Sequence, residues 1–191
     1  MSAYVLFFGG YQASASDVKA WWASAKAQKP DVMFDCFPWP SGANADAESA
    51  VSTFTKAGSY ALALTTIHSH AVDNIYIVGH SSGCAIANAV DRGLKGTSKI
   101  TLVALDGFAP NGEQRARPNT QIWAAECGSA KSRNHDALKR VAGDRLKIYK
   151  ATDCVQPWAL HFSVVNSAAF DKTVTSIATG YAQCRANLMW L

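Results

Sequence analysis

The sequence has no long hydrophobic run. None of its apolar stretches approaches the roughly 20 residues that a membrane-spanning helix needs. The amino terminus also lacks the basic leader, long apolar segment and small-residue cleavage site of a signal peptide. We therefore expect a chain without a membrane span that resides in the cytoplasm, and we interpret residues 4–8 as the first strand of the core.

The sequence lacks the cysteine spacing of the usual metal and redox sites. The five cysteines show neither a C-x-x-C pair nor the spacing of metal ligands. We expect buried free thiols, no metal and no cofactor. One pairing stays open, because Cys127 and Cys154 both follow predicted strands at their carboxyl ends, where a disulfide is geometrically allowed.

The content of charged residues is also low, which limits the kinds of partner that the chain is expected to bind. Charged residues make up 17% of the sequence and the formal net charge is +4. The basic side chains that gather between residues 111 and 150 fit a solvated helical face. Nucleic-acid binding is therefore not supported, and the oligomeric state is left open.

The 191 residues, 49% of them hydrophobic, are enough for one well-filled core, so we expect a single domain over residues 1–191. Apolar, β-branched runs alternate with stretches of helical character. This alternation predicts an α/β fold of three layers, α/β/α, with a mostly parallel sheet of about six strands. The predicted strands are 4–8, 32–37, 75–78, 100–105, 121–125 and 146–150. The predicted helices are 16–28, 45–70 with a break near Gly58, 84–93, 132–142 and 167–183.

The most informative motif is Gly-His-Ser-Ser-Gly at residues 79–83, which matches the G-x-S-x-G nucleophile elbow. An apolar strand precedes it and a helix rich in small residues follows it, which is the structural context that the motif requires. The glycines let a strained turn pass close to neighbouring backbone. Ser81 is therefore predicted to be a nucleophile at the tip of the sheet.

With this motif and its order of strands, the chain resembles a small α/β hydrolase that lacks the first two strands of the larger members. The resemblance spans essentially the whole chain, but the elbow is its one specific motif. The connection 107–120 is too short for the helical lid that larger members insert there. We therefore expect an open, cutinase-like cleft, in a chain that resembles the cutinase-like or thioesterase-like members of the family.

A serine hydroxyl needs a histidine base within hydrogen-bond reach. Family order is serine, acid, histidine, and His68, His70 and His80 lie before or beside the nucleophile. Of the remaining two, His161 follows the last predicted strand and precedes the last helix, as the family base does, and its Leu-His-Phe-Ser surroundings resemble those of thioesterases. His135 lies in a basic helical segment, so we assign the base to His161.

Three carboxylates compete for the acid. Asp106 ends the strand after the nucleophile helix, in a Leu-Asp-Gly-Phe-Ala-Pro sequence that resembles the acid site of thioesterase domains and some lipases. Asp153 resembles the acid of cutinases, which shares a loop with the base. Glu126 ends the strand that most often carries the acid in this family. We favour Asp106, and Asp153 is the main alternative.

Acyl transfer also needs backbone N–H donors for the oxyanion. The residue after the nucleophile, Ser82, supplies one, and the Gly-Gly loop after the first strand supplies the other, from Gly10 or Tyr11. Trp39, Phe108 and Trp158, together with Tyr11, follow strands at their carboxyl ends, where ligands bind in open α/β sheets. We expect these aromatics to line a pocket for an apolar acyl or aryl group.

The sequence thus predicts a serine hydrolase acting on a small-molecule carboxylic ester, with an acyl thioesterase as the alternative. The thioesterase alternative draws on the surroundings of Asp106 and His161. A non-catalytic binding protein of the same fold is the alternative from another class, although binding alone does not require a serine between two glycines.

Overall fold

The computed structural model describes residues 3–28, 30, 32–44, 46–69, 74–95, 99–105, 121–126, 146–150 and 189–190. Its centre is a seven-stranded sheet in the order β2-β1-β3-β4-β5-β6-β7. The first six strands are mutually parallel. They are β1 (Ala3–Phe8), β2 (Met33–Phe37), β3 (Asn74–His80), β4 (Lys99–Leu105), β5 (Gln121–Glu126) and β6 (Leu146–Lys150). All six lie where the sequence predicts a strand, and the predicted α/β class is confirmed.

The sheet has one strand beyond the six that the sequence predicts. A seventh strand, β7 (Met189–Trp190), pairs antiparallel with β6. Two residues are too few to show the apolar alternation by which a strand is recognised in a sequence. This strand extends the sheet on the side away from β2 and makes it mostly, not wholly, parallel.

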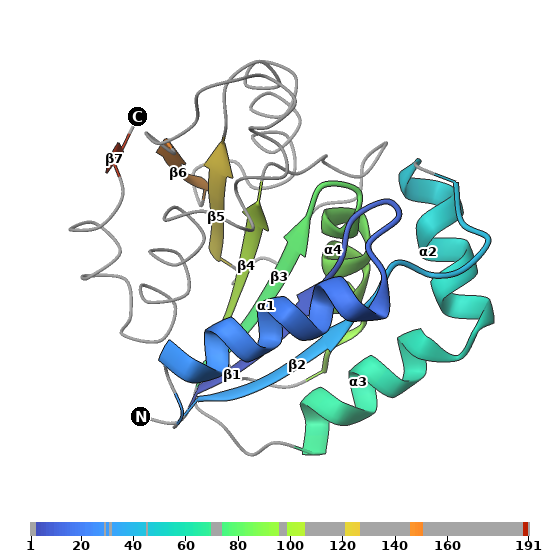
Figure 1. Ribbon diagram of the computed structural model, residues 1–191, viewed down its shortest axis with the longest axis horizontal. Helices are drawn as coiled ribbons and strands as arrows, with labels where there is room; N and C mark the ends of the chain where they lie inside the picture. The colour runs from blue at the N-terminus through green and yellow to red at the C-terminus, as the bar shows by residue number, and fades with distance from the viewer. Residues whose placement is uncertain are drawn as a thin grey trace.

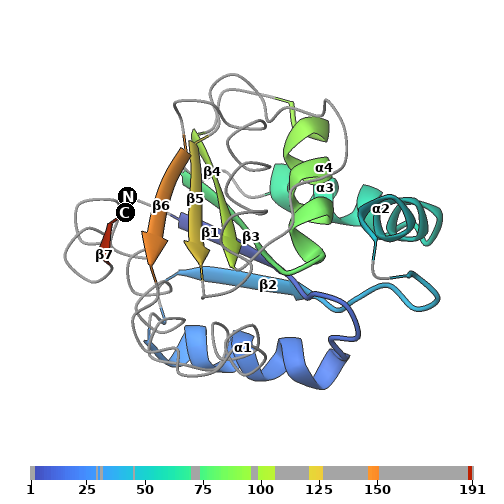
Figure 2. The same ribbon diagram turned by 90° about the horizontal axis from the view of Figure 1, so that it is seen from above.

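Helices cover both faces of the sheet (Figures 1 and 2). Helix α1 (Ala15–Gln28) lies on one face against β1 and β2, and α2 (Ala47–Lys56), α3 (Ser59–Ser69) and α4 (Gly83–Gly93) lie on the other. These are three of the helical stretches that the sequence predicts. The other two, 132–142 and 167–183, lie outside the described residues.

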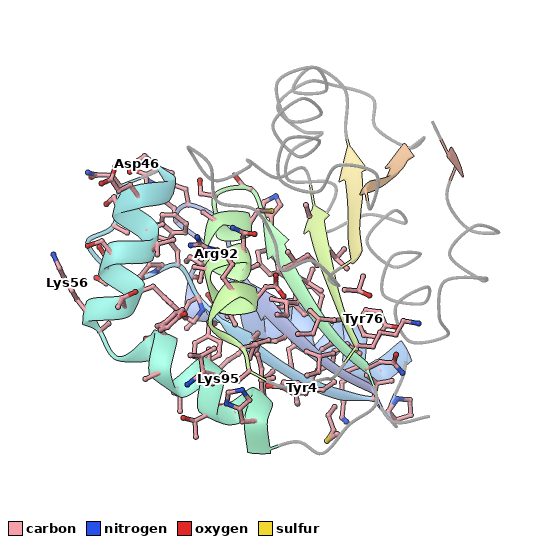
Figure 3. All side chains as sticks on the ribbon, turned by 180° about the vertical axis from the view of Figure 1, so that it is seen from behind. Tyr4, Asp46, Lys56, Tyr76, Arg92 and Lys95 are labelled. Atoms are coloured by element: carbon pink, nitrogen blue, oxygen red, sulfur yellow. The ribbon has the colours of Figure 1, made fainter. Side chains whose placement is uncertain are left out.

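Local signals set the ends of these helices. Ser14 and Asp17 form a reciprocal cap at the start of α1. The N–H of Ser14 donates to the carboxylate of Asp17 at 2.8 Å, and the N–H of Asp17 donates to the hydroxyl of Ser14 at 3.2 Å. The carboxylate of Asp46 accepts from the N–H of Ser49 at 2.7 Å and caps α2, whose two ends Figure 3 marks with Asp46 and Lys56. The predicted break lies at Gly58, whose φ of 75° separates α2 from α3.

The strands at the centre of the sheet are buried on both faces, as covered parallel strands must be. Tyr4, Leu6 and Phe8 of β1 belong to the core on the side of α2, α3 and α4. The hydroxyl of Tyr4 donates to the carboxylate of Asp35 on β2 at 2.9 Å, so the one polar atom of this buried ring has a partner. The buried, hydrogen-bonded strands therefore form a well-packed base for the carboxyl edge of the sheet, where the predicted site lies.

Candidate active site

Ser81 lies in a sharp turn between the end of β3 and the start of α4. Its φ is 52°, in the left-handed region that a non-glycine residue rarely adopts. Such a conformation costs on the order of 1–3 kcal/mol and persists only where the surrounding structure imposes it. The residue is 5% exposed. The turn is closed by the N–H of Cys84, which donates to the carbonyl of Ser81 at 3.1 Å.

The two glycines of the motif are required by close backbone contacts. A Cβ built on Gly79 would lie 2.6 Å from Cα of Cys84, and one built on Gly83 would lie 2.6 Å from the carbonyl oxygens of Phe8 and Gly9. Real Cβ atoms do not approach backbone so closely, so no other residue fits either position without a shift. The first turn of α4 is thereby packed against the loop that follows β1.

That loop also lies against the serine. Figure 1 shows the segment after β1, in blue, beside the green turn between β3 and α4. A Cβ built on Gly10 would lie 2.7 Å from the carbonyl oxygen of His80 and 2.8 Å from Cβ of Ser81. The structure therefore brings together Ser81 and Gly10, two residues that the sequence analysis placed in one site.

Tyr11 and Trp39 form the aromatic part of this edge. The N–H of Ala13 donates to the carbonyl of Gly10 at 2.9 Å, and this turn has Tyr11 and Gln12 at its tip, with a φ of 65° at Gln12. Tyr11 is 45% exposed and meets the ring of Trp39 edge-on, with centroids 5.9 Å apart. The indole N–H of the buried Trp39 donates to the carbonyl of Ala43 at 3.2 Å, which fixes the ring that supports Tyr11.

Ser82, the other predicted oxyanion donor, is the N-cap residue of α4 and is 3% exposed. Next to it, the thiol of Cys84 donates to the carbonyl of Gly79 at 3.0 Å. This contact joins the first turn of α4 to the end of β3 from inside the elbow. Cys84 is thus a structural thiol of the turn.

The remaining predicted site residues lie outside the described residues. They are the base His161, the acids Asp106 and Asp153, and the pocket residues Phe108 and Trp158. Outside the described residues lie also His135, which was not assigned to the site, and Cys127 and Cys154, whose pairing the sequence leaves open. Glu126 is described only as the last residue of β5. In the register of the sheet, Leu105, the residue before Asp106, pairs with His80, the residue before Ser81.

Two further properties of the described residues bear on cofactors and membranes. Within them, no group of three or more histidines, cysteines and carboxylates is arranged to hold a metal ion. Burial, and secondarily the carboxylate of Asp35, raises the pKa of the Cys36 thiol, which disfavours the thiolate that metals bind. None of the described helices has the length and apolar character to cross a bilayer.

One contact near the serine was not predicted. The ring of Trp21, on α1, lies edge-on to the ring of His80, with centroids 6.0 Å apart. The sequence shows Trp21 and Trp22 side by side, and the pattern alone does not tell which of them faces the sheet. The structure buries Trp21, at 8% exposed, and leaves Trp22 38% exposed.

Comparisons with known proteins identify the fold. No model of a known protein family matches the chain, and no curated protein matches it. Among solved structures, a Xanthomonas campestris protein described as a hydrolase of the α/β superfamily is 12% identical with a TM-score of 0.60, over 91% of this chain and 98% of that one. The ydeN gene product of Bacillus subtilis is 19% identical with a TM-score of 0.58, over 94% and 100%.

A third structure, carboxyl esterase 2 from the fungus Tuber melanosporum, is 13% identical with a TM-score of 0.52, over 96% of this chain and 78% of that one. These proteins are similar in fold across nearly the whole chain, at an identity too low to carry over a substrate. Taken with the strand order and the turn at Ser81, they show that the chain has the fold of the small α/β hydrolases.

Proposed function

We propose that the chain is a serine hydrolase that cleaves a carboxylic ester through an acyl-enzyme on Ser81. The observation that carries this proposal is the left-handed φ of 52° at a buried serine that lies against Gly10. A binding surface has no need of a strained serine, whereas a nucleophile that must project from a tight turn does. The likeness in fold to a carboxyl esterase supports the same reaction class.

In the proposed reaction, Oγ of Ser81 attacks the ester carbonyl carbon while its proton passes to His161. The carbonyl oxygen becomes an oxyanion, which accepts hydrogen bonds from the N–H of Ser82 and from the N–H of Gly10 or Tyr11. Collapse of this intermediate breaks the bond to the alcohol, which takes the proton from the imidazolium. Water then attacks the acyl-enzyme by the same route and regenerates the serine.

The close packing of the Gly10 loop on the elbow gives this scheme a physical basis. Backbone donors stabilise an oxyanion only if they are held in place before charge develops, since reorganisation would consume the gain. Gly83 and Ser81 both contact the loop through atoms that cannot rotate away. The loop is therefore packed against both the first turn of α4 and the serine.

A fluorophosphonate probe tests the proposal, since it bonds covalently to a competent serine and not to a passive one. We expect the parent to be labelled and to hydrolyse p-nitrophenyl acetate, and Ser81→Ala to do neither. Ser82→Ala is the matched control, because it removes the neighbouring buried hydroxyl and keeps the backbone donor. Labelling that persists in Ser81→Ala, or a parent that neither labels nor hydrolyses any ester, would favour the non-catalytic alternative.

Substrate preference distinguishes the thioesterase alternative from the proposed esterase. The Leu-Asp-Gly-Phe sequence at residues 105–108 and the His-Phe pair at 161–162 resemble thioesterase sites. Comparing kcat/KM for acyl-coenzyme A with that for p-nitrophenyl esters of the same acyl group measures which of the two substrate classes the protein prefers. We expect the oxygen ester to be the better substrate.

A further inference from the structure

His80, the residue before the proposed nucleophile, lies between α1 and the loop after β1. It is the last residue of β3 and is 4% exposed. On one side its ring meets the ring of Trp21 edge-on, with centroids 6.0 Å apart. On the other side, a Cβ built on Gly10 would lie 3.1 Å from Nδ1 of His80. The imidazole thus fills the space between the first helix and Gly10.

The loop after β1 is held on its opposite side by α4. A Cβ built on Gly83 would lie 2.6 Å from the carbonyl oxygens of Phe8 and Gly9. The loop backbone is therefore packed between the first turn of α4 and the ring of His80. Backbone atoms of α4 cannot yield, but a shorter side chain at position 80 would leave an empty space beside Gly10, into which the loop can shift relative to Ser81.

We propose that His80 is a positioning residue, whose imidazole fixes the position of Gly10 relative to Ser81 and is itself supported by Trp21. This inference rests on the proposed function, because it assigns to His80 the placement of an oxyanion donor. In this role the ring acts through its size and planarity. Burial beneath Trp21 suits this role, since a packed core group keeps one position while the reaction proceeds.

Two substitutions of His80 separate packing from any chemical role. His80→Ala removes the ring, and we expect kcat for p-nitrophenyl acetate and the fluorophosphonate labelling rate to fall about 10- to 100-fold, as for a catalytic group displaced by about an ångström. KM should change by less than about threefold, because donor placement affects the transition state more than ground-state binding. His80→Phe keeps a planar ring, and we expect it to retain kcat within about threefold.

Trp21→Ala tests the support from the other side. This substitution leaves the residues Gly10, His80 and Ser81 unaltered but removes the ring that supports the imidazole. We therefore expect kcat to fall as in His80→Ala, but by a smaller factor. Ile67→Ala, on α3 and 1% exposed in the core, is the control for lost stability. It should lower the melting temperature and leave kcat unchanged when all variants are assayed well below their melting temperatures.

A readout that needs no activity keeps this inference distinct from the proposed function. Amide hydrogen exchange across residues 9–13 should become faster in His80→Ala and stay as in the parent in His80→Phe. If the parent hydrolyses no ester, the proposed function fails while exchange still decides whether His80 holds the loop. Unchanged exchange and kcat in His80→Ala, or an inactive His80→Phe, would overturn the inference.

Discussion

Gly10 and Ser81 are in contact across the carboxyl edge of the sheet, where a Cβ built on Gly10 would lie 2.8 Å from Cβ of Ser81. The contact follows from the register of the parallel strands. Phe8 pairs with Gly79, and each of the two contacting residues lies two positions beyond this pair. The same alignment that builds the sheet therefore brings a glycine of one loop to the proposed nucleophile of the other.

Gly10→Ala is expected to lower kcat sharply. The added Cβ would lie 2.7 Å from the carbonyl oxygen of His80 as well as 2.8 Å from Ser81, and the first of these is backbone that cannot rotate away. The loop must shift, and we expect a fall in kcat of about 100-fold or more, the size of losing one oxyanion donor. Steady-state kinetics on p-nitrophenyl acetate measures it.

Gly42→Ala is the matched control for Gly10→Ala. Gly42 has a φ of 84°, and no atom lies within 4 Å of a Cβ built on it. Alanine at this position is therefore strained in its backbone but has no steric clash. We expect a loss of about 1 kcal/mol in unfolding free energy and an unchanged kcat. If both variants keep full activity, the loop has no part in catalysis.

Much of this site could be predicted from local sequence, and the rest depends on contacts between distant segments. The six parallel strands, α1 to α4 and the turn at residues 79–83 each have a local signature of apolar runs and glycines. The contact of Trp21 with His80 has none, because it depends on how α1 is rotated against the sheet. The two-residue β7 has none either, since its formation depends on pairing with β6.

Ser81→Gly is expected to be inactive yet more stable than the parent. A φ of 52° is unfavourable for serine and costs glycine nothing, so glycine should relieve the strain at the turn. We expect a gain of about 0.5–1 kcal/mol in the free energy of unfolding, measured in urea. Ser81→Ala is the control, since it loses the hydroxyl but keeps the strain. A destabilised Ser81→Gly would show that the hydroxyl, and not the backbone, dominates at this position.

Tyr11→Ala is expected to change substrate preference. The exposed ring of Tyr11 is supported by Trp39 next to Gly10, where an acyl group would pack against it. We expect kcat/KM for p-nitrophenyl hexanoate to fall about tenfold relative to the acetate, the value of a few lost apolar contacts. Tyr11→Phe should keep the parent ratio. Leu62→Ala, which removes a 58% exposed side chain on α3, controls for surface hydrophobicity.

Asp17→Ala is expected to lower stability at neutral pH but not in acid. Hydrogen bonds from the side chain and then the backbone of Ser14 lower the pKa of the Asp17 carboxyl. A carboxyl whose pKa is lower in the folded state contributes stability above its unfolded pKa, and this contribution is lost as the pH falls through the folded pKa. The exposed site limits the effect to about 0.5–1 kcal/mol, the value of a helix cap.

Urea unfolding of the parent and Asp17→Ala from pH 7 down to about pH 3 measures the difference, which should shrink as the carboxyl of Asp17 is protonated. Glu48→Ala is the matched control, because it removes an exposed carboxylate from the first turn of α2. A difference between parent and Asp17→Ala that is the same at every pH would contradict a role for the charge of Asp17.

The identity of the acid is decided by comparing Asp106→Asn with Asp153→Asn. Leu105 pairs with His80, so the chain leaves β4 one residue before Asp106 and directly beside the residue that precedes Ser81. Asp153 follows β6, which is separated from β3 by β4 and β5, a distance of about 14 Å at the usual strand spacing. An imidazole that reaches the serine is therefore within shorter reach of a carboxylate delivered by β4.

We expect Asp106→Asn to lower kcat by about 10⁴-fold, because an amide cannot stabilise the imidazolium or fix its tautomer. Asp153→Asn should stay within about tenfold of the parent. Circular dichroism of both variants shows whether the fold is kept, which the isosteric amide favours because it preserves the shape of the side chain. The opposite ranking would mean that the loop after β6 folds back to the base, and that the acid and histidine share one loop as they do in cutinases.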